Sequence, residues 1–339
     1  MDMEKNSNSV NLSYKEEYKS KRIVDWEKHW PEEWREYRRK WVENPKKHDP
    51  GQFPIHLDLE ATRVCNLKCV MCFRTVKIAA GDEFPEGDMD FSLYKKIVDE
   101  GAQNGLYSIK LSYLGEPLVS KDIVRMIKYA RSKGILDAMF NTNGVLLTKD
   151  LSKELIEAGV TGVFISFDSP FKEHFESIRV GAKFDDVINN VKELVRIREK
   201  MGSFFPIVRV SMTVMKENAN EISEFLKLWE PIVDVVGFGQ YVDPHHKDKK
   251  ANDRRAYQLQ NQDFFTCPQL YQRLVVHWDG RIGLCCADYD AEMGLGNAKD
   301  VSIKSVWLGE KMQHLRRLNE QGLWRKIPLC LKCDLPHSK

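Results

Sequence analysis

Cys65-Asn66-Leu67-Lys68-Cys69-Val70-Met71-Cys72 is the stretch around which the chain is organised, because it places three thiols in eight residues at the spacing C-x3-C-x2-C. Thiolates are soft ligands that favour iron–sulfur clusters, zinc or Cu(I). No fourth Cys or His lies close by, and the nearest histidine, His56, is on the far side of a predicted strand. A structural zinc site has four ligands. Three thiolates on a cubane instead leave one iron open, so the stretch favours an iron–sulfur cluster that can bind a further ligand.

The chain around this stretch alternates apolar strands with amphipathic helices from Ile55 onward. The pattern predicts strands near residues 55–60, 108–113, 138–141, 162–167, 207–214 and 233–240, and helices near 91–102, 121–133, 149–158, 185–200 and 219–229. Repeated βα units imply a parallel sheet with right-handed crossovers. Six such units are too few for a closed eight-stranded barrel. We therefore expect an open α/β core over residues 51–240.

Informative residues follow several of these strands, at the edge where parallel sheets bind ligands. Gly115-Glu116-Pro117 ends the second strand, Asn141 begins the turn after the third, and Ser166-Phe167-Asp168 ends the fourth. Taken alone, each could be an ordinary turn, since Asn and Gly are common turn residues. Their combination with the cysteine stretch is a more specific sign of a ligand-binding site than any of them alone.

The cysteine spacing, directly after a hydrophobic strand and about forty residues before Gly-Glu-Pro, resembles the radical S-adenosylmethionine (radical SAM) enzymes. The resemblance implies a partial (β/α)6 TIM-like barrel, with a [4Fe–4S] cluster on Cys65, Cys69 and Cys72. It also implies that the open iron binds the amino and carboxylate groups of SAM. Reduction then releases a 5′-deoxyadenosyl radical, which abstracts a hydrogen atom from a C–H bond.

The resemblance also implies a set of SAM contacts. Gly-Glu-Pro receives the methionine ammonium group, a turn lines the pocket, a Ser-Xaa-Asp element contacts the ribose or carboxylate, and an arginine pairs with the carboxylate. The residue before the third cysteine is often aromatic and packs near adenine, and this chain departs from that pattern with a methionine, which can fill the same space. In this chain these residues are Gly115, Glu116, Pro117, Asn141, Ser166, Asp168, Arg179 and Met71. The alternative for Arg179 is a surface arginine at a helix-to-loop bend.

A second group of cysteines lies near the C-terminus: Cys267, Cys285, Cys330 and Cys333. Apolar runs on both sides of Asp279-Gly280 predict a hairpin that carries one of them, and a helix is expected near 303–321. By itself the group could be a four-thiolate zinc ribbon. The pattern also resembles the SPASM/Twitch appendage of radical SAM enzymes, here over 264–339. Because no cysteine follows Cys333, this resemblance implies one auxiliary [4Fe–4S] cluster, closer to Twitch.

Cys286 is left over from both groups. Adjacent strand residues point to opposite faces, so Cys286 is not expected to share a cluster with Cys285. One interpretation is a small buried apolar residue. The other is a catalytic hydrogen-atom donor to a substrate radical.

Residues 1–50 form a charged N-terminal extension, with disorder expected over 1–13 and helix from Tyr14 to Trp41. One helix face carries the aromatic stripe Trp26, Trp30, Trp34, Tyr37 and Trp41. Two interpretations are open: the stripe packs outside the core, or it forms a lid or substrate wall. Residues 44–54 are expected to be a linker. A second linker, over 241–263, is either solvated or contacts a phosphate or carboxylate on the substrate.

Composition limits the remaining possibilities. The chain has 339 residues and a net charge of +2, which gives no argument for nucleic-acid or membrane partners. No apolar run reaches the roughly 18 residues that span a bilayer, and the first residues lack a signal-peptide pattern. We expect a cytoplasmic protein whose eight cysteines serve metal or catalysis.

These expectations lead to a radical SAM enzyme that oxidises or epimerises a carbohydrate-like small molecule, such as a sugar, aminocyclitol or nucleotide sugar. The first alternative is a maturase that modifies a peptide or protein side chain. The second is a non-catalytic iron–sulfur or zinc-binding protein. The family resemblance implies a flavodoxin or ferredoxin as the reductant.

Overall fold

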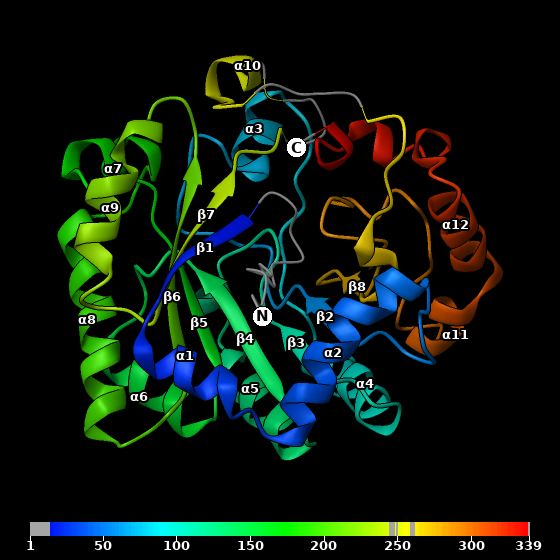
Figure 1. Ribbon diagram of the computed structural model, residues 1–339, viewed down its shortest axis with the longest axis horizontal. Helices are drawn as coiled ribbons and strands as arrows, with labels where there is room; N and C mark the ends of the chain where they lie inside the picture. The colour runs from blue at the N-terminus through cyan, green and yellow to red at the C-terminus, as the bar shows by residue number, and fades with distance from the viewer. Residues whose placement is uncertain (1–13, 244–247, 249, 258–261, 338–339) are drawn as a thin grey trace, which may run out of the picture.

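The fold is one nine-stranded sheet with helices around it (Figure 1), in a computed structural model that describes residues 14–243, 248, 250–257 and 262–337. The strand order is β1-β7-β6-β5-β4-β3-β2-β8-β9. Strands β2 to β7 run parallel, so the predicted partial (β/α)6 barrel is present. The bounds are β1 (Tyr14–Lys19), β2 (His56–Leu59), β3 (Ser108–Lys110), β4 (Asp137–Thr142), β5 (Gly162–Ser166), β6 (Ile207–Val214), β7 (Val235–Gln240), β8 (Arg273–Val276) and β9 (Ile282–Gly283).

The helices that follow the strands bury one apolar face against the sheet. In α5, for example, Met126 and Ile127 are fully buried, as the helical spacing of apolar residues requires. The predicted helices are observed as α4 (Phe91–Gln103), α5 (Ile123–Ser132), α6 (Lys149–Glu157), α8 (Phe184–Lys200) and α9 (Ile222–Trp229). Two short helices, α3 (Phe73–Ala79) and α7 (Lys172–Ile178), were not predicted.

The N-terminal extension differs from its prediction at both ends. Residues 14–19 form a strand rather than a helix, because β1 pairs antiparallel with the otherwise open edge of β7 and tertiary pairing overrides helix propensity. Two helices follow, α1 (Lys21–Lys28) and α2 (Glu32–Lys47), so part of the predicted linker over 44–54 is helical. Pro45 lies inside α2 and cannot donate to the carbonyl of Trp41. The side-chain Nε2 of Gln272 donates to that oxygen instead, at 2.6 Å.

The extension closes the end of the barrel where the strands begin. Trp34 stacks on Phe205, just before β6, with ring centroids 6.0 Å apart. Tyr37 stacks on Tyr107, just before β3, at 5.6 Å. Ile55, just before β2, belongs to the same buried cluster. Aromatic side chains of α1 and α2 therefore cover the amino ends of the parallel strands.

The C-terminal part is joined to the barrel through the sheet. The predicted hairpin is present, with Gly280 at φ 91° in its turn, but β8 also pairs in parallel with β2. The predicted helix near 303–321 is two helices, α11 (Ile303–Leu308) and α12 (Glu310–Glu320), separated at Gly309. A short helix, α10 (Ala251–Arg254), lies within the predicted second linker. Among the described residues, no helix has the length and apolarity needed to cross a membrane.

Candidate active site

The loop with the first three cysteines follows the carboxyl end of β2, as expected. Its backbone is held by Lys68 N–H to Val180 O and by Val70 N–H to Ile178 O, at 3.0 and 3.1 Å. Burial, together with the charges of Glu116 and the neighbouring thiols, raises the pKa of the Cys65 thiol to about 11. Buried thiols that resist ionisation are suited to a metal centre, whose positive charge stabilises thiolates.

Arg179 provides a positive charge beside this loop. Its Nη1 lies 3.8 Å from Cys69 Sγ, and its Nε donates to Asp168 at 2.5 Å. The side chain is 12% exposed, so the alternative of a surface arginine is wrong. Burial lowers the pKa of Arg179, but Asp168 and the thiols outweigh it and raise the pKa overall. The fully buried Asp168 also accepts from Thr213 N–H at 2.8 Å, so it fixes the guanidinium next to the thiols.

Gly115 and Glu116 attach the end of β3 to the cysteine loop. Glu116 N–H donates to Val64 O at 2.8 Å, and a Cβ on Gly115 would lie 2.2 Å from Thr62 O. Only glycine therefore permits this approach. The Glu116 carboxylate accepts from Thr142 Oγ1 at 2.6 Å and from Asn143 N–H at 2.7 Å, which links β3 to β4. Burial raises its pKa, while these donors lower it. Pro117 starts the short 3-10 turn that follows.

A cavity of about 470 Å³ fills the interior of the barrel. Asn141 and Ser166 line it near the carboxyl ends of β4 and β5, and Asp137 and Thr161 line it near the amino ends. Four residues of strand separate Asp137 from Asn141, which is about 13 Å. Met71 is partly buried and packs against a cluster that contains Ile178 and Met215. Of the residues predicted for SAM, Asn141 and Ser166 line this cavity, whereas Gly115, Glu116, Pro117, Asp168, Arg179 and Met71 lie outside its lining.

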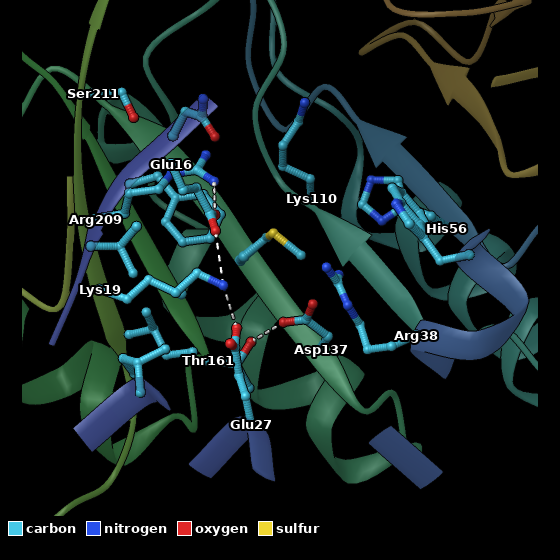
Figure 2. A pocket seen from close by; sticks show the side chains of 18 of the residues that line it. Glu16, Lys19, Glu27, Arg38, His56, Lys110, Asp137, Thr161, Arg209 and Ser211 are labelled. Carbon is cyan, nitrogen blue, oxygen red and sulfur yellow. Dashed lines mark hydrogen bonds and ion pairs between the residues drawn. The ribbon is translucent and has the colours of Figure 1, made fainter. Parts of the chain in front are cut away.

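The aromatic stripe of the extension lines the other end. Trp26, Trp30, Trp34, Tyr37 and Trp41 all line the cavity. The geometry therefore favours the interpretation that the aromatic stripe forms a substrate wall. Charged side chains of the extension reach the same space (Figure 2): Lys19 pairs with Glu27 at 2.7 Å, and Arg38 faces Asp137.

A buried charge network beside this cavity was not predicted. Asp58 is fully buried and pairs with Lys110 at 2.6 Å and with Arg273 at 3.2 Å. His56 contacts Asp58 at 3.4 Å and Ser108 Oγ at 2.9 Å. Burial lowers the pKa of His56 to about 4, although Asp58 opposes the shift. The only sequence signal is the charged alternation in the predicted strand, which reads His56-Leu57-Asp58.

The second group of cysteines also lies in an apolar setting. Cys267, Cys330 and Cys333 pack against the buried cluster of Phe265, Trp324 and Leu335. Burial raises the pKa of Cys267 and of Cys330 to about 12, with neighbouring thiols adding to both. The pKa of Cys285 is raised by burial and by the charges of Cys286, Cys267, Cys333 and Cys330, so Cys286 lies in the same region as the four predicted ligands. Across the described residues, no three His, Cys, Asp or Glu side chains converge closely enough to hold a single metal ion.

Cys286 is held by a buried glutamine. Gln269 Nε2 donates to Cys286 Sγ at 3.0 Å, and Gln269 Oε1 accepts from Cys286 N–H at 3.1 Å. Tyr113, at the end of β3, donates its hydroxyl to Cys286 O at 3.2 Å. The thiol is therefore fixed at the boundary between the barrel and the C-terminal part.

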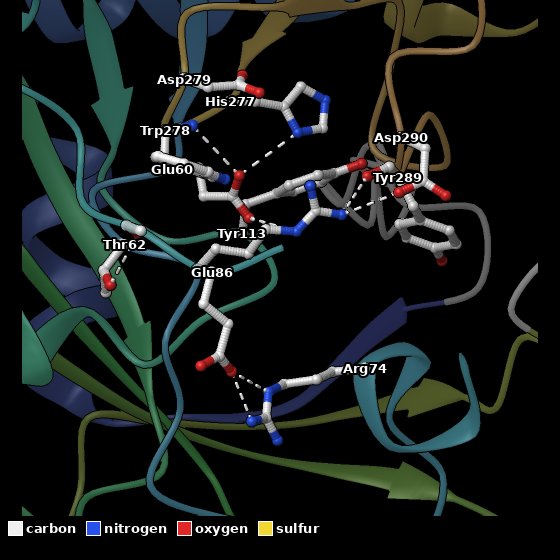
Figure 3. Close-up of polar contacts among 12 residues, drawn as sticks. Glu60, Thr62, Arg74, Glu86, Tyr113, His277, Trp278, Asp279, Tyr289 and Asp290 are labelled. Carbon is white, nitrogen blue, oxygen red and sulfur yellow. Dashed lines mark hydrogen bonds and ion pairs between the residues drawn. The ribbon is translucent and has the colours of Figure 1, made fainter. Parts of the chain in front are cut away.

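A buried polar junction connects the two cysteine groups (Figure 3). Glu60, at the end of β2, accepts from Trp278 N–H at 3.2 Å and lies 3.4 Å from His277 Nδ1. Tyr289 stacks on Phe73 with centroids 4.3 Å apart. Burial raises the pKa of Tyr289, and so do the charges of Cys286, of Cys333 and Cys285 in the second group, and of Cys72 in the first. Tyr289 thus lies between the two groups.

Comparison with known proteins identifies both regions. The profile of the radical SAM superfamily matches residues 59–228, and that of the SPASM iron–sulfur cluster-binding domain matches residues 267–334. The chain is 34% identical over 329 residues to the tungsten-containing aldehyde ferredoxin oxidoreductase cofactor-modifying protein of Pyrococcus furiosus, covering 83% of this chain and 87% of the relative. It spans only half the length of the GTP 3′,8-cyclase of Thermodesulfovibrio yellowstonii, at 35% identity over half of this chain.

Two solved structures share the fold at low sequence identity. SuiB of Streptococcus suis, bound to precursor peptide SuiA, has a TM-score of 0.62 at 18% identity, covering 88% of this chain and 74% of SuiB. BtrN, in complex with AdoMet and 2-DOIA, has a TM-score of 0.56 at 17% identity, covering 84% and 94%.

Proposed function

We propose a reaction from one premise: the chain belongs to the radical SAM superfamily and carries a SPASM iron–sulfur domain. The protein is therefore an enzyme that uses a [4Fe–4S] cluster, SAM and auxiliary iron–sulfur. When bound, the cluster and SAM supply a 5′-deoxyadenosyl radical. The proposed reaction is hydrogen abstraction from a carbohydrate-like small molecule, which is oxidised or epimerised.

In this proposal Cys65, Cys69 and Cys72 hold the SAM-binding cluster. One auxiliary [4Fe–4S] cluster is held by four thiolates: Cys267, Cys285, Cys330 and Cys333. The apolar surroundings and the mutual proximity of the thiols support both assignments. A four-thiolate cluster has no open iron, so it is suited to accepting or relaying an electron rather than to binding substrate. A flavodoxin or ferredoxin would supply the first electron.

The SAM-binding residues in the proposal surround the cysteine loop. Arg179 pairs with the carboxylate of SAM, and Glu116, with the Gly115-Pro117 turn, receives its ammonium. Ser166 and Asn141 face the ribose side from the cavity, Asp168 positions Arg179, and Met71 packs near adenine. The support is geometric: Arg179 lies 3.8 Å from Cys69 Sγ, and Glu116 is bonded to the same loop through Val64.

The size and lining of the cavity support a small-molecule substrate. Its volume of about 470 Å³ lies within the range of small-molecule sites, and the aromatic extension closes its far end. Tryptophan faces suit the apolar faces of rings, while Asp137, Thr161, Ser166 and Ser211 offer hydrogen bonds to hydroxyls. The relative from Pyrococcus furiosus is named for modifying a cofactor, which also favours a small molecule over a peptide.

In this proposal Cys286 decides whether the substrate is epimerised or oxidised. A thiol held by Gln269 at the boundary between the barrel and the C-terminal part can return a hydrogen atom to a substrate radical, which gives epimerisation. The sulfur radical left on Cys286 then takes one electron from the flavodoxin or ferredoxin and one proton to restore the thiol. Loss of an electron and a proton from the radical instead gives a ketone, with the auxiliary cluster as electron acceptor. Replacement of Cys286 by alanine separates the outcomes: an epimerase loses its product, whereas an oxidase keeps it.

The test is anaerobic reconstitution followed by dithionite and SAM, with detection of 5′-deoxyadenosine. We expect about eight irons per chain, as two [4Fe–4S] clusters require, and slow deoxyadenosine release without substrate. A substrate screen then uses deuterated sugars and reads deuterium in deoxyadenosine. The proposal fails if the Cys65, Cys69 and Cys72 cluster is filled but no sugar or cofactor-like molecule stimulates SAM cleavage, while a peptide does.

A further inference from the structure

The lining of the barrel cavity has an excess of positive charge. Its cationic side chains come from five different elements: Lys19, Arg38, Lys110, Arg209 and Arg273. Three carboxylates line the same cavity, Glu16, Glu27 and Asp137, and Asp58 lies behind Lys110 and Arg273 as a fourth. A partly enclosed site with excess charge of one sign attracts a ligand of the other sign, because its low-dielectric walls focus the field.

Hydrogen-bond donors on the lining lack acceptors. Among the described residues, Trp30 Nε1 and Arg273 Nε are buried and have no hydrogen-bond partner. Both residues line the cavity. A buried donor without an acceptor destabilises the fold. Both nitrogens are shielded from the cavity, so a ligand rich in oxygen acceptors would pair with them once these side chains turn toward it.

The extension directs two of the cations toward the closed end. Lys19 Nζ is held between Glu16, at 3.2 Å, and Glu27, at 2.7 Å, so the ammonium points into the cavity (Figure 2). Arg38 lies against the rings of Trp30 and Tyr37, with its guanidinium carbon 5.8 Å from each centroid. Asp137, which Arg38 faces, is held by the Thr161 hydroxyl at 2.5 Å.

We propose that the substrate is an organic anion whose phosphate or carboxylate group is held at the closed end of the barrel by Lys19 and Arg38. The reacting carbon would lie toward Asn141 and Ser166, about 13 Å away along β4. Lys19 and Arg38 are specificity-determining residues, because they belong to an extension that lies outside the radical SAM match at 59–228. This inference rests on the proposed function, since it assigns the substrate class of the same cavity.

The test measures binding to the reconstituted holoenzyme without dithionite. The probes are inorganic phosphate, glucose 6-phosphate and glucose, and the readout is tryptophan fluorescence, because Trp26, Trp30, Trp34 and Trp41 line the cavity. We expect glucose 6-phosphate to bind at least tenfold more tightly than glucose. Its affinity should fall with added salt. The double variant K19Q/R38Q should lose at least tenfold in affinity for both phosphate probes.

A matched control uses K28Q/R35Q, which removes two exposed cations of α1 and α2 in the same extension. Its phosphate binding should equal that of the native protein. The charge-conserving variant K19R/R38K should retain binding, which separates lost charge from lost folding. Equal binding of glucose and glucose 6-phosphate, absence of phosphate binding, or unchanged binding in folded K19Q/R38Q would each overturn the inference. Deoxyadenosine formation in the native protein tests the proposed function separately.

Discussion

His56 should make the stability of this protein fall on mild acidification. The imidazole is 3% exposed, and burial lowers its pKa to about 4, against the opposing effect of Asp58. The pKa in the unfolded chain is about 6.5. Between these two values the unfolded chain binds more protons than the folded one. Stability is therefore full above pH 6.5 and is lost as the pH falls toward 4.

The size of this stability loss follows from the difference between the two pKa values of His56. Between pH 7.5 and 5.5 the linkage amounts to about 1.4 kcal/mol for this one group. A chain of 339 residues has an unfolding entropy of about 0.7 kcal/mol/K, so the loss corresponds to a fall in Tm of about 2 °C. Other groups also titrate in this range, so the quantity to compare is the change in Tm between variants.

The assay is thermal unfolding of the holoenzyme at pH 7.5 and 5.5 for the native protein, His56→Gln and His29→Gln. His56→Gln removes the titrating group, so its Tm should fall about 2 °C less on acidification, whatever its Tm at pH 7.5. His29 is exposed on α1, and its replacement should leave the pH effect unchanged. An identical pH effect in His56→Gln and the native protein would refute the reasoning.

Three further predictions concern the cysteine loops. Gly115→Ala would place a methyl group 2.2 Å from Thr62 O, and overpacking against the backbone costs about 1–3 kcal/mol of stability. We expect a lower Tm and loss of iron from the first cluster, and a native Tm with native iron content would contradict the close approach. Asp168→Asn removes the partner of the buried Arg179 and should lower the free energy of unfolding by about 3–5 kcal/mol, measured by thermal unfolding. Asp185→Asn, in an exposed pair with Lys172, should lower it by less than about 1 kcal/mol, and similar losses in the two variants would exclude a special role for Asp168. Cys333→Ala should lower bound iron from about eight to about four per chain, while Cys286→Ala keeps about eight; iron loss in Cys286→Ala would make that thiol a ligand.

The sequence alone determined the features that depend on local spacing. Three thiols within eight residues, Gly-Glu-Pro after a strand, and six alternations of strand and helix each have a short-range pattern, and the barrel follows from them. Arg179 and Asp168 could be named only through the family resemblance. Their mutual ion pair could not be derived, because it depends on how α7 returns to the end of β5.

Tertiary structure decided the features that depend on unfilled sheet edges and barrel ends. Lys15-Glu16-Glu17 is a charged stretch without strand alternation, and it becomes β1 because the edge of β7 offers backbone partners. The same applies to β8, which joins β2 after more than two hundred intervening residues. The aromatic stripe had two possible positions, and only the docking of α1 and α2 across the strand ends made it a cavity wall. Helical spacing specifies which side chains share a face, whereas the surface that the face meets is set by long-range packing.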